Sequence, residues 1–180
     1  MSQKHISTNQ SHWLFFALWP GAELQQQFVN IARGVNEQCN GIQVPLQNIH
    51  LTLVFIGAVE QKAIAQLIDA AKTVRCEAFS LRLDRIGVFR NSKIAWLAPE
   101  KTPPELTALV NDLRHALRRA GFAFDNKPFV PHITLLRKAG LFAEITLNLA
   151  IDWRVNGFAL VQSHSGKNGL QYEVINRFGV

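Results

Sequence analysis

The 180-residue sequence lacks features that several classes of protein need. Its longest apolar run, WLFFALW at residues 13–19, is well short of the ~18 residues that span a membrane, and Pro20 ends it. The polar residues 1–12 have no apolar core for a secretory signal, so we expect them to form a flexible tail. H-E-x-x-H and C-x-x-C spacings are both absent, and we therefore expect no metal and no other cofactor.

Cysteine is scarce, with only Cys39 and Cys76 in the chain. Two thiols are too few for a disulfide framework, and each is expected to fill a small apolar site. Reduced cysteines in a chain with no recognisable targeting segment indicate the cytoplasm.

Acidic residues are outnumbered, which gives a net charge of +6 and a pI near 9.8. The excess lies in residues 76–138, which carry eleven Lys and Arg against six Asp and Glu. A basic face attracts phosphates by releasing counterions, so nucleic acid is one partner that this charge favours. The other interpretation is that positive charge only aids solubility, and charge alone leaves both open.

Apolar periodicity predicts strands and helices in an order that partly repeats. Amphipathic helices are expected near residues 21–39, 61–74 and 103–121, with strands between them and a hairpin at the C-terminal end. We expect one α/β domain (α+β type) over residues 13–180, built from pseudo-repeats at 13–98 and 99–180. It would be bilobal, with two duplicated lobes, each having a small, mainly antiparallel sheet and outer helices, around a central cleft.

The tetrapeptide HLTL at His50–Leu53 recurs as HITL at His132–Leu135, although the chain has only six histidines. Successive side chains on a strand alternate between its faces. His50 and Thr52 therefore share one face, and the leucines point to the other. If the halves pack with approximate two-fold symmetry, both His-Thr pairs face one cleft.

Two imidazoles and two hydroxyls around a cleft suit a phosphodiester. A neutral His can take a proton from water while a charged His protonates the leaving oxygen. Threonine hydroxyls can donate hydrogen bonds to the non-bridging oxygens, where negative charge sits in the transition state. The alternative is that both are silent, buried strand histidines; the matched flanking residues favour catalysis. His5, His12 and His164 are expected at the surface.

HLTL and HITL resemble the paired H-x-T-x motifs of the 2H phosphoesterase superfamily. The segments FFALWP, HLTLVFIG, GVFRNSKIAWLAP, PHITLLR, FALVQS and YEVINRF resemble its bacterial RNA 2′,3′-cyclic phosphodiesterases, also called 2′-5′ RNA ligases. The resemblance implies metal-independent hydrolysis of a terminal 2′,3′-cyclic phosphate to a 2′-phosphate, with weak, reversible 2′-5′ joining of RNA.

The resemblance also implies a role for each motif residue. His50 would be the proton donor to the 3′ leaving oxygen, and His132 the proton acceptor that activates water. Thr52 and Thr134 would bind the phosphoryl oxygens.

Arg137, five residues after His132, matches an Arg of the family's extended second motif, and a guanidinium suits a phosphate. An odd offset places it on the opposite face of an ideal strand, so a bulge or the strand end must redirect it. Phe55 has the same offset from His50 and either stacks on a base or is an ordinary core aromatic.

The expected partner is RNA with 2′,3′-cyclic phosphate ends, such as tRNA halves, and the chain is expected to act as a monomer away from membranes. Ligation as the physiological reaction would use the same residues as hydrolysis. A rival of another class is an RNA- or nucleotide-binding module that grips phosphate without turnover.

Overall fold

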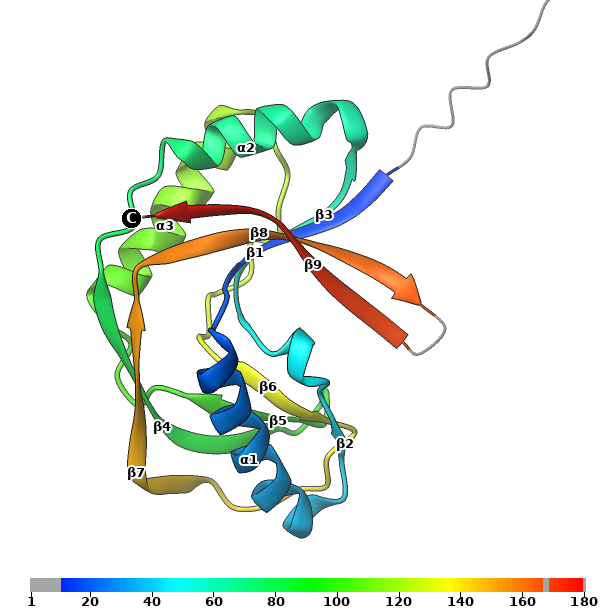
Figure 1. The fold of residues 1–180 in the computed structure, drawn as a ribbon, viewed down its shortest axis with the longest axis vertical. Coiled ribbons are helices and arrows are strands. Elements are labelled where there is room, and N and C mark those ends of the chain that lie inside the picture. Colours follow the sequence, from blue (N-terminus) through cyan, green and yellow to red (C-terminus); the bar gives the residue numbers. More distant parts are fainter. Residues whose placement is uncertain (1–10, 167–168, 180) are drawn as a thin grey trace, which may run out of the picture.

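The computed structural model describes residues 11–166 and 169–179 (Figure 1). The helices are α1 (Ala22–Cys39), α2 (Ile64–Lys72) and α3 (Pro104–Arg119), with short 3-10 turns at Leu46–Asn48 and Gln61–Ala63. The strands are β1 (Ser11–Leu18), β2 (Ile42–Gln43), β3 (Leu51–Glu60), β4 (Phe79–Phe89), β5 (Ile94–Ala98), β6 (Ile133–Arg137), β7 (Ile145–Val155), β8 (Gly157–Gly166) and β9 (Gly169–Gly179).

The strands form one antiparallel sheet in the order β7-β4-β5-β6-β3-β1-β8-β9, with β2 beside β6. Two halves are distinguished below: the β1 half (β3, β1, β8 and β9) and the β4 half (β7, β4, β5 and β6, with β2). They meet where β3 runs beside β6, through the backbone pair Leu51 and Ile133. The α/β class with mainly antiparallel strands is confirmed.

The predicted pseudo-repeats, 13–98 and 99–180, do not coincide with the two halves of the sheet. The β1 half combines β1 and β3 with β8 and β9, and the β4 half combines β4 and β5 with β6 and β7. The chain crosses between the halves at Asn156, which alone separates β7 from β8. Each half of the sheet therefore contains strands from both predicted pseudo-repeats. The bilobal shape with a central cleft stays a prediction.

Element boundaries differ from the expected ones in two places. β1 begins at Ser11, so the predicted tail is wrong for residues 11 and 12, which pair with β3; residues 1–10 lie outside the described part. The helix expected at 61–74 is a 3-10 turn followed by α2. The C-terminal hairpin is confirmed as β8 and β9. No helix in the described ranges is long and apolar enough to cross a membrane.

The helices pack on the sheet through their apolar stripes. α1 contacts β6 and β2, while α3 contacts β3 and α2 contacts β9 (Figure 1). Phe28, Ala32 and Val35 of α1 are buried at steps of four and three, as an amphipathic helix requires. A second, smaller cluster lies in the β1 half, made of Phe15, Ala17, Ala159 and Val161 with Trp19, Tyr172 and Val174 against it.

Truncation of Leu113 tests this packing. Its side chain on α3 is fully buried, so Leu113→Ala leaves a cavity and should lower the free energy of unfolding by about 2–5 kcal/mol. Leu149 on β7 is 86% exposed, and the matched Leu149→Ala should change it by less than ~0.5 kcal/mol. Urea unfolding measures both; equal effects would contradict the placement of α3.

Candidate active site

The two tetrapeptides meet at the junction between the halves of the sheet. Leu51 and Ile133 are fully buried and form an antiparallel pair. This register places His50 across from Thr134 and Thr52 across from His132, because opposite residues in an antiparallel pair run in reverse order. The motifs are therefore related by an approximate local two-fold axis, and the side chains expected to share a site come together.

A bulge in β6 redirects Arg137. Two consecutive residues of β5 pair with Thr134 and Leu136, which leaves Leu135 as an extra residue. Leu135 and Leu136 are both buried and Arg137 is exposed, so the alternation of faces is broken at this point. Arg137 thus lies on the face of Thr134, close enough to His50 to lower the pKa of that ring.

The same bulge occurs in β3. Thr52 and Val54 pair with consecutive residues of β1, and Leu53 is the extra residue. Leu53 and Val54 are buried, whereas Phe55 is 53% exposed, with its ring centroid 5.7 Å from that of Phe15. The interpretation of Phe55 as a core aromatic is therefore wrong. Phe55 occupies in the first motif the position that Arg137 has in the second.

Both histidines are held in the same way. His50 Nδ1 lies 2.7 Å from the Asn48 carbonyl oxygen, and His132 Nδ1 lies 2.8 Å from that of Val130. A carbonyl only accepts, so each Nδ1 carries a hydrogen and, in the neutral ring, Nε2 carries the lone pair. The Thr52 hydroxyl, 2.9 Å from His50 Nε2, donates to it in that state. Nε2 is therefore the atom of each neutral ring that can accept a proton.

Aromatic rings enclose His50 more than His132. Its ring centroid lies 4.9 Å from Phe15, 5.6 Å from a nearly parallel Trp19 and 5.2 Å from a perpendicular Tyr172. His132 contacts Phe89, with centroids 5.0 Å apart. The site is thus chemically asymmetric although its backbone is nearly symmetric.

Burial lowers the pKa of both rings. For His50 it lowers the pKa to about 4, helped by the charges of Arg137 and His132 and opposed by the hydrogen bond to the Asn48 carbonyl. For His132 burial also lowers the pKa, against the bond to Val130. Both histidines are therefore neutral at pH 7 in the unliganded protein.

A hollow of about 200 Å³ joins the motifs to the loop after α3; Thr52, Phe55, Arg114, Lys127 and His132 are among its lining residues. Arg114 donates from its guanidinium to the Lys127 carbonyl oxygen, at 2.8 Å. Sequence reasoning did not select Arg114, although the basic excess in 76–138 was a signal for it. His115 lies in a separate hollow with Arg75, Arg118 and Arg119.

Asn48 is a second residue that sequence reasoning missed. Its side chain is buried, donates to the Leu170 carbonyl at 2.7 Å and accepts from the Tyr172 amide at 3.2 Å. Its own carbonyl accepts from His50. Asn48 therefore fastens β9, and with it the Tyr172 ring, beside His50. The only sign of this role in the sequence is that a short polar residue stands two positions before the first motif histidine.

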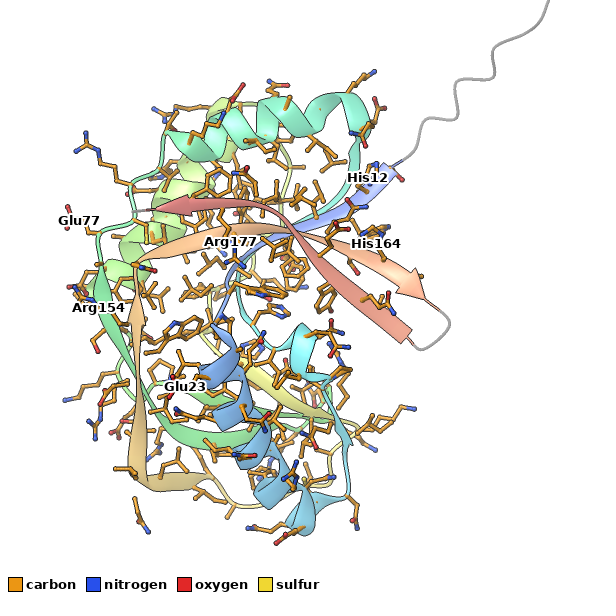
Figure 2. All side chains as sticks on the ribbon, viewed as in Figure 1. His12, Glu23, Glu77, Arg154, His164 and Arg177 are labelled. Carbon is orange, nitrogen blue, oxygen red and sulfur yellow. The ribbon has the colours of Figure 1, made fainter. Side chains whose placement is uncertain are left out.

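The other described histidines lie apart from the motifs. His12 and His164, labelled in Figure 2, lie toward the outer ends of β1 and β8. His12 is half-buried and bonds to Gln162, and His164 lies 3.1 Å from Glu173. His5 is outside the described residues. Within 11–166 and 169–179, no three His, Cys, Asp or Glu side chains gather as a metal site.

Comparison with known proteins finds the same family throughout. A family model described as the 2′-5′ RNA ligase superfamily matches residues 20–167. An RNA 2′,3′-cyclic phosphodiesterase of Escherichia coli (strain K12) is 32% identical over 169 residues, covering 93% of this chain and 96% of the relative. One of Thermus thermophilus is 30% identical over 180 residues, covering 93% and 89%.

A solved structure supports the same relationship. The crystal structure of E. coli LigT complexed with 3′-AMP superposes with a TM-score of 0.86 and 31% sequence identity, and the match covers 95% of this chain and 99% of that chain.

The low pKa of His50 makes the stability depend on pH. Between its ordinary value of 6.5 and about 4, the unfolded chain binds a proton at this residue and the folded chain does not. The free energy of unfolding therefore keeps its full value with respect to His50 above pH 6.5. We expect it to fall by about 2–3 kcal/mol as the pH is lowered to 4. In urea unfolding, the free energy of unfolding of His50→Gln should depend less on pH between 4 and 6.5 than that of the wild type. Above pH 7 the two proteins should show the same dependence on pH. An unchanged slope would contradict the burial of His50.

Proposed function

Because the chain belongs to the 2′-5′ RNA ligase superfamily, we propose that it is an RNA 2′,3′-cyclic phosphodiesterase, which hydrolyses a terminal cyclic phosphate to a 2′-phosphate. The observation that carries the proposal is the Leu51–Ile133 register, which sets the two His-x-Thr pairs across from one another. Thr52 of one motif and His132 of the other line a common hollow. The E. coli and Thermus relatives named for this activity match over 93% of the chain.

The cyclic phosphate would lie between the two imidazoles. Thr52 and Thr134, each across from the histidine of the other motif, would donate to the non-bridging oxygens. In the free protein the Thr52 hydroxyl donates to His50 Nε2. When His50 gains its proton this hydroxyl is released, and it can then donate to the phosphate, where it stabilises charge in the transition state.

Hydrolysis then needs two proton transfers. His132 Nε2 takes a proton from water as the water oxygen attacks phosphorus, and the bond from phosphorus to O3′ breaks. His50 Nε2 gives its proton to O3′, which leaves a 3′-hydroxyl and a 2′-phosphate. The carbonyls of Asn48 and Val130 accept from Nδ1–H and stabilise each ring in its charged form.

His50 must gain a proton when the substrate binds, because its pKa of about 4 leaves it neutral beforehand. An anionic diester beside the ring favours the imidazolium and raises this pKa. The phosphate also offsets the charge of Arg137, which lowers the pKa of His50 in the free protein. Substrate binding thus supplies the charge state that the proton donor needs.

Arg137 and Phe55 complete the binding of the terminal nucleotide in this proposal. The guanidinium of Arg137 binds a phosphoryl oxygen, and the exposed ring of Phe55 stacks on the base. The equivalent bulges support these two roles, since they bring one residue from each motif to the site face.

The proposed substrate is RNA with a 2′,3′-cyclic phosphate end, including tRNA halves. An RNA 5′-hydroxyl in the place of water would give 2′-5′ joining through the same residues. One chain carries both motifs, so we propose a monomer. The free thiols of Cys39 and Cys76 support the cytoplasm as its compartment.

Removal of each histidine tests both the site and the roles. On RNA ending in a 2′,3′-cyclic phosphate, His50→Ala and His132→Ala should each lower kcat/KM about 10²- to 10⁴-fold. A substrate with sulfur in place of O3′ needs no proton on its leaving group. The loss in His50→Ala should then shrink at least ~tenfold, while that in His132→Ala should persist.

The surface variant His164→Ala is the matched control and should keep full activity, as should the wild type in excess EDTA. Undiminished turnover in both site variants would refute the site. The reverse pattern on the thio substrate would exchange the roles of donor and acceptor. Binding of the RNA without turnover by the wild type would favour the non-catalytic module.

A further inference from the structure

A second hollow of about 600 Å³ adjoins the motif hollow. It is lined by Trp13, Phe15, Phe55, Asp125, Ser163 and Tyr172, among others. Phe55 and Asp125 line both hollows, so the two are neighbours. This groove is called the Trp13 groove below.

The Trp13 groove extends along the sheet away from His50. Trp13 and Phe15 lie on the same face of β1, since they are two residues apart. Phe15 contacts the His50 ring, and Trp13, farther from the motif, pairs with Ser163 of β8. A ligand that begins at the histidines and passes Phe55 therefore meets Trp13 next.

The lining suits a flat, uncharged ligand. Trp13 is 64% exposed and Phe55 is 53% exposed, so two aromatic faces are open to solvent. Ser163 and Ser165 supply hydroxyls. The carboxyl of Asp125, whose pKa is lowered by hydrogen bonds from Lys127, adds a negative acceptor. The described lining residues include no Lys or Arg, so the groove disfavours phosphate.

Within an RNA, the uncharged flat parts are the bases. The volume lies within the range of about 300–1,000 Å³ of small-molecule sites, which leaves space beyond the terminal base on Phe55. We propose that the Trp13 groove binds the base of the nucleotide preceding the cyclic-phosphate end, by stacking on Trp13. This inference rests on the proposed function for the direction in which the RNA runs.

If a base stacks in the Trp13 groove, kcat/KM depends on whether the substrate has a second nucleotide. A dinucleotide has the second base and a mononucleotide lacks it, so the groove favours RNA ends over free cyclic mononucleotides. Every base has a π-face, so this preference depends little on sequence.

The test compares adenosine 2′,3′-cyclic phosphate with the diadenosine dinucleotide ending in the same group. The ratio of their kcat/KM values, dinucleotide over mononucleotide, should be about ten or more in the wild type. In Trp13→Ala it should fall about tenfold through KM, and Trp13→Phe should retain most of it. A dinucleotide without its 5′ base should behave as the mononucleotide does in all three proteins.

Leu149→Ala, a truncation of an even more exposed apolar side chain on β7, is the control and should leave the ratio unchanged. Trp13 is mainly exposed, so its variants should keep the thermal midpoint of the wild type. An equal ratio in the wild type and Trp13→Ala would overturn the groove and leave the proposed function standing.

Calorimetry with the dinucleotide bearing a 2′-phosphate separates the two proposals. About tenfold weaker binding by Trp13→Ala supports the groove without any turnover, and equal binding overturns it. Absence of turnover on every cyclic phosphate would instead refute the proposed function.

Discussion

The backbone pair between Leu51 of β3 and Ile133 of β6 joins the halves of the sheet, and the geometry of the site depends on it. Both side chains are fully buried, which keeps the polar residues on either side of them on the opposite face. A slip of one residue would send His50 and Thr52 into the core. The register therefore gives two short, unremarkable strand segments a common site.

A bulge in each motif brings a different kind of side chain to the site face. Each inserts a leucine after the threonine, and each turns the residue five positions after the histidine to the site face. That residue is Phe55 on one side and Arg137 on the other. The surroundings of the histidines differ as well, since three aromatic rings surround His50. A nearly symmetric backbone thus carries an asymmetric pair of proton-transfer groups.

The alternation of a strand was enough to predict that His50 shares a face with Thr52, which their hydrogen bond confirms. The odd offset of Arg137 also predicted that a bulge or the strand end redirects its side chain, and a bulge is present. Phe55 could not be placed in this way, because alternation fails wherever an extra residue enters the strand. The pairing of β1 with β8, and the bonds of Asn48 to β9, depend on contacts more than 100 residues apart in sequence. Local patterns carry no information on these contacts.

The central claim is that one phosphate is shared by both histidines, and imidazole NMR tests it most directly. Adenosine 2′-phosphate, titrated into the protein, should raise the pKa of His50 and of His132 together, because a dianion between the rings favours both charged forms. Both responses should saturate at the same concentration, with one ligand bound per chain. A response confined to one histidine, or two responses that saturate at different concentrations, would contradict a shared phosphate site.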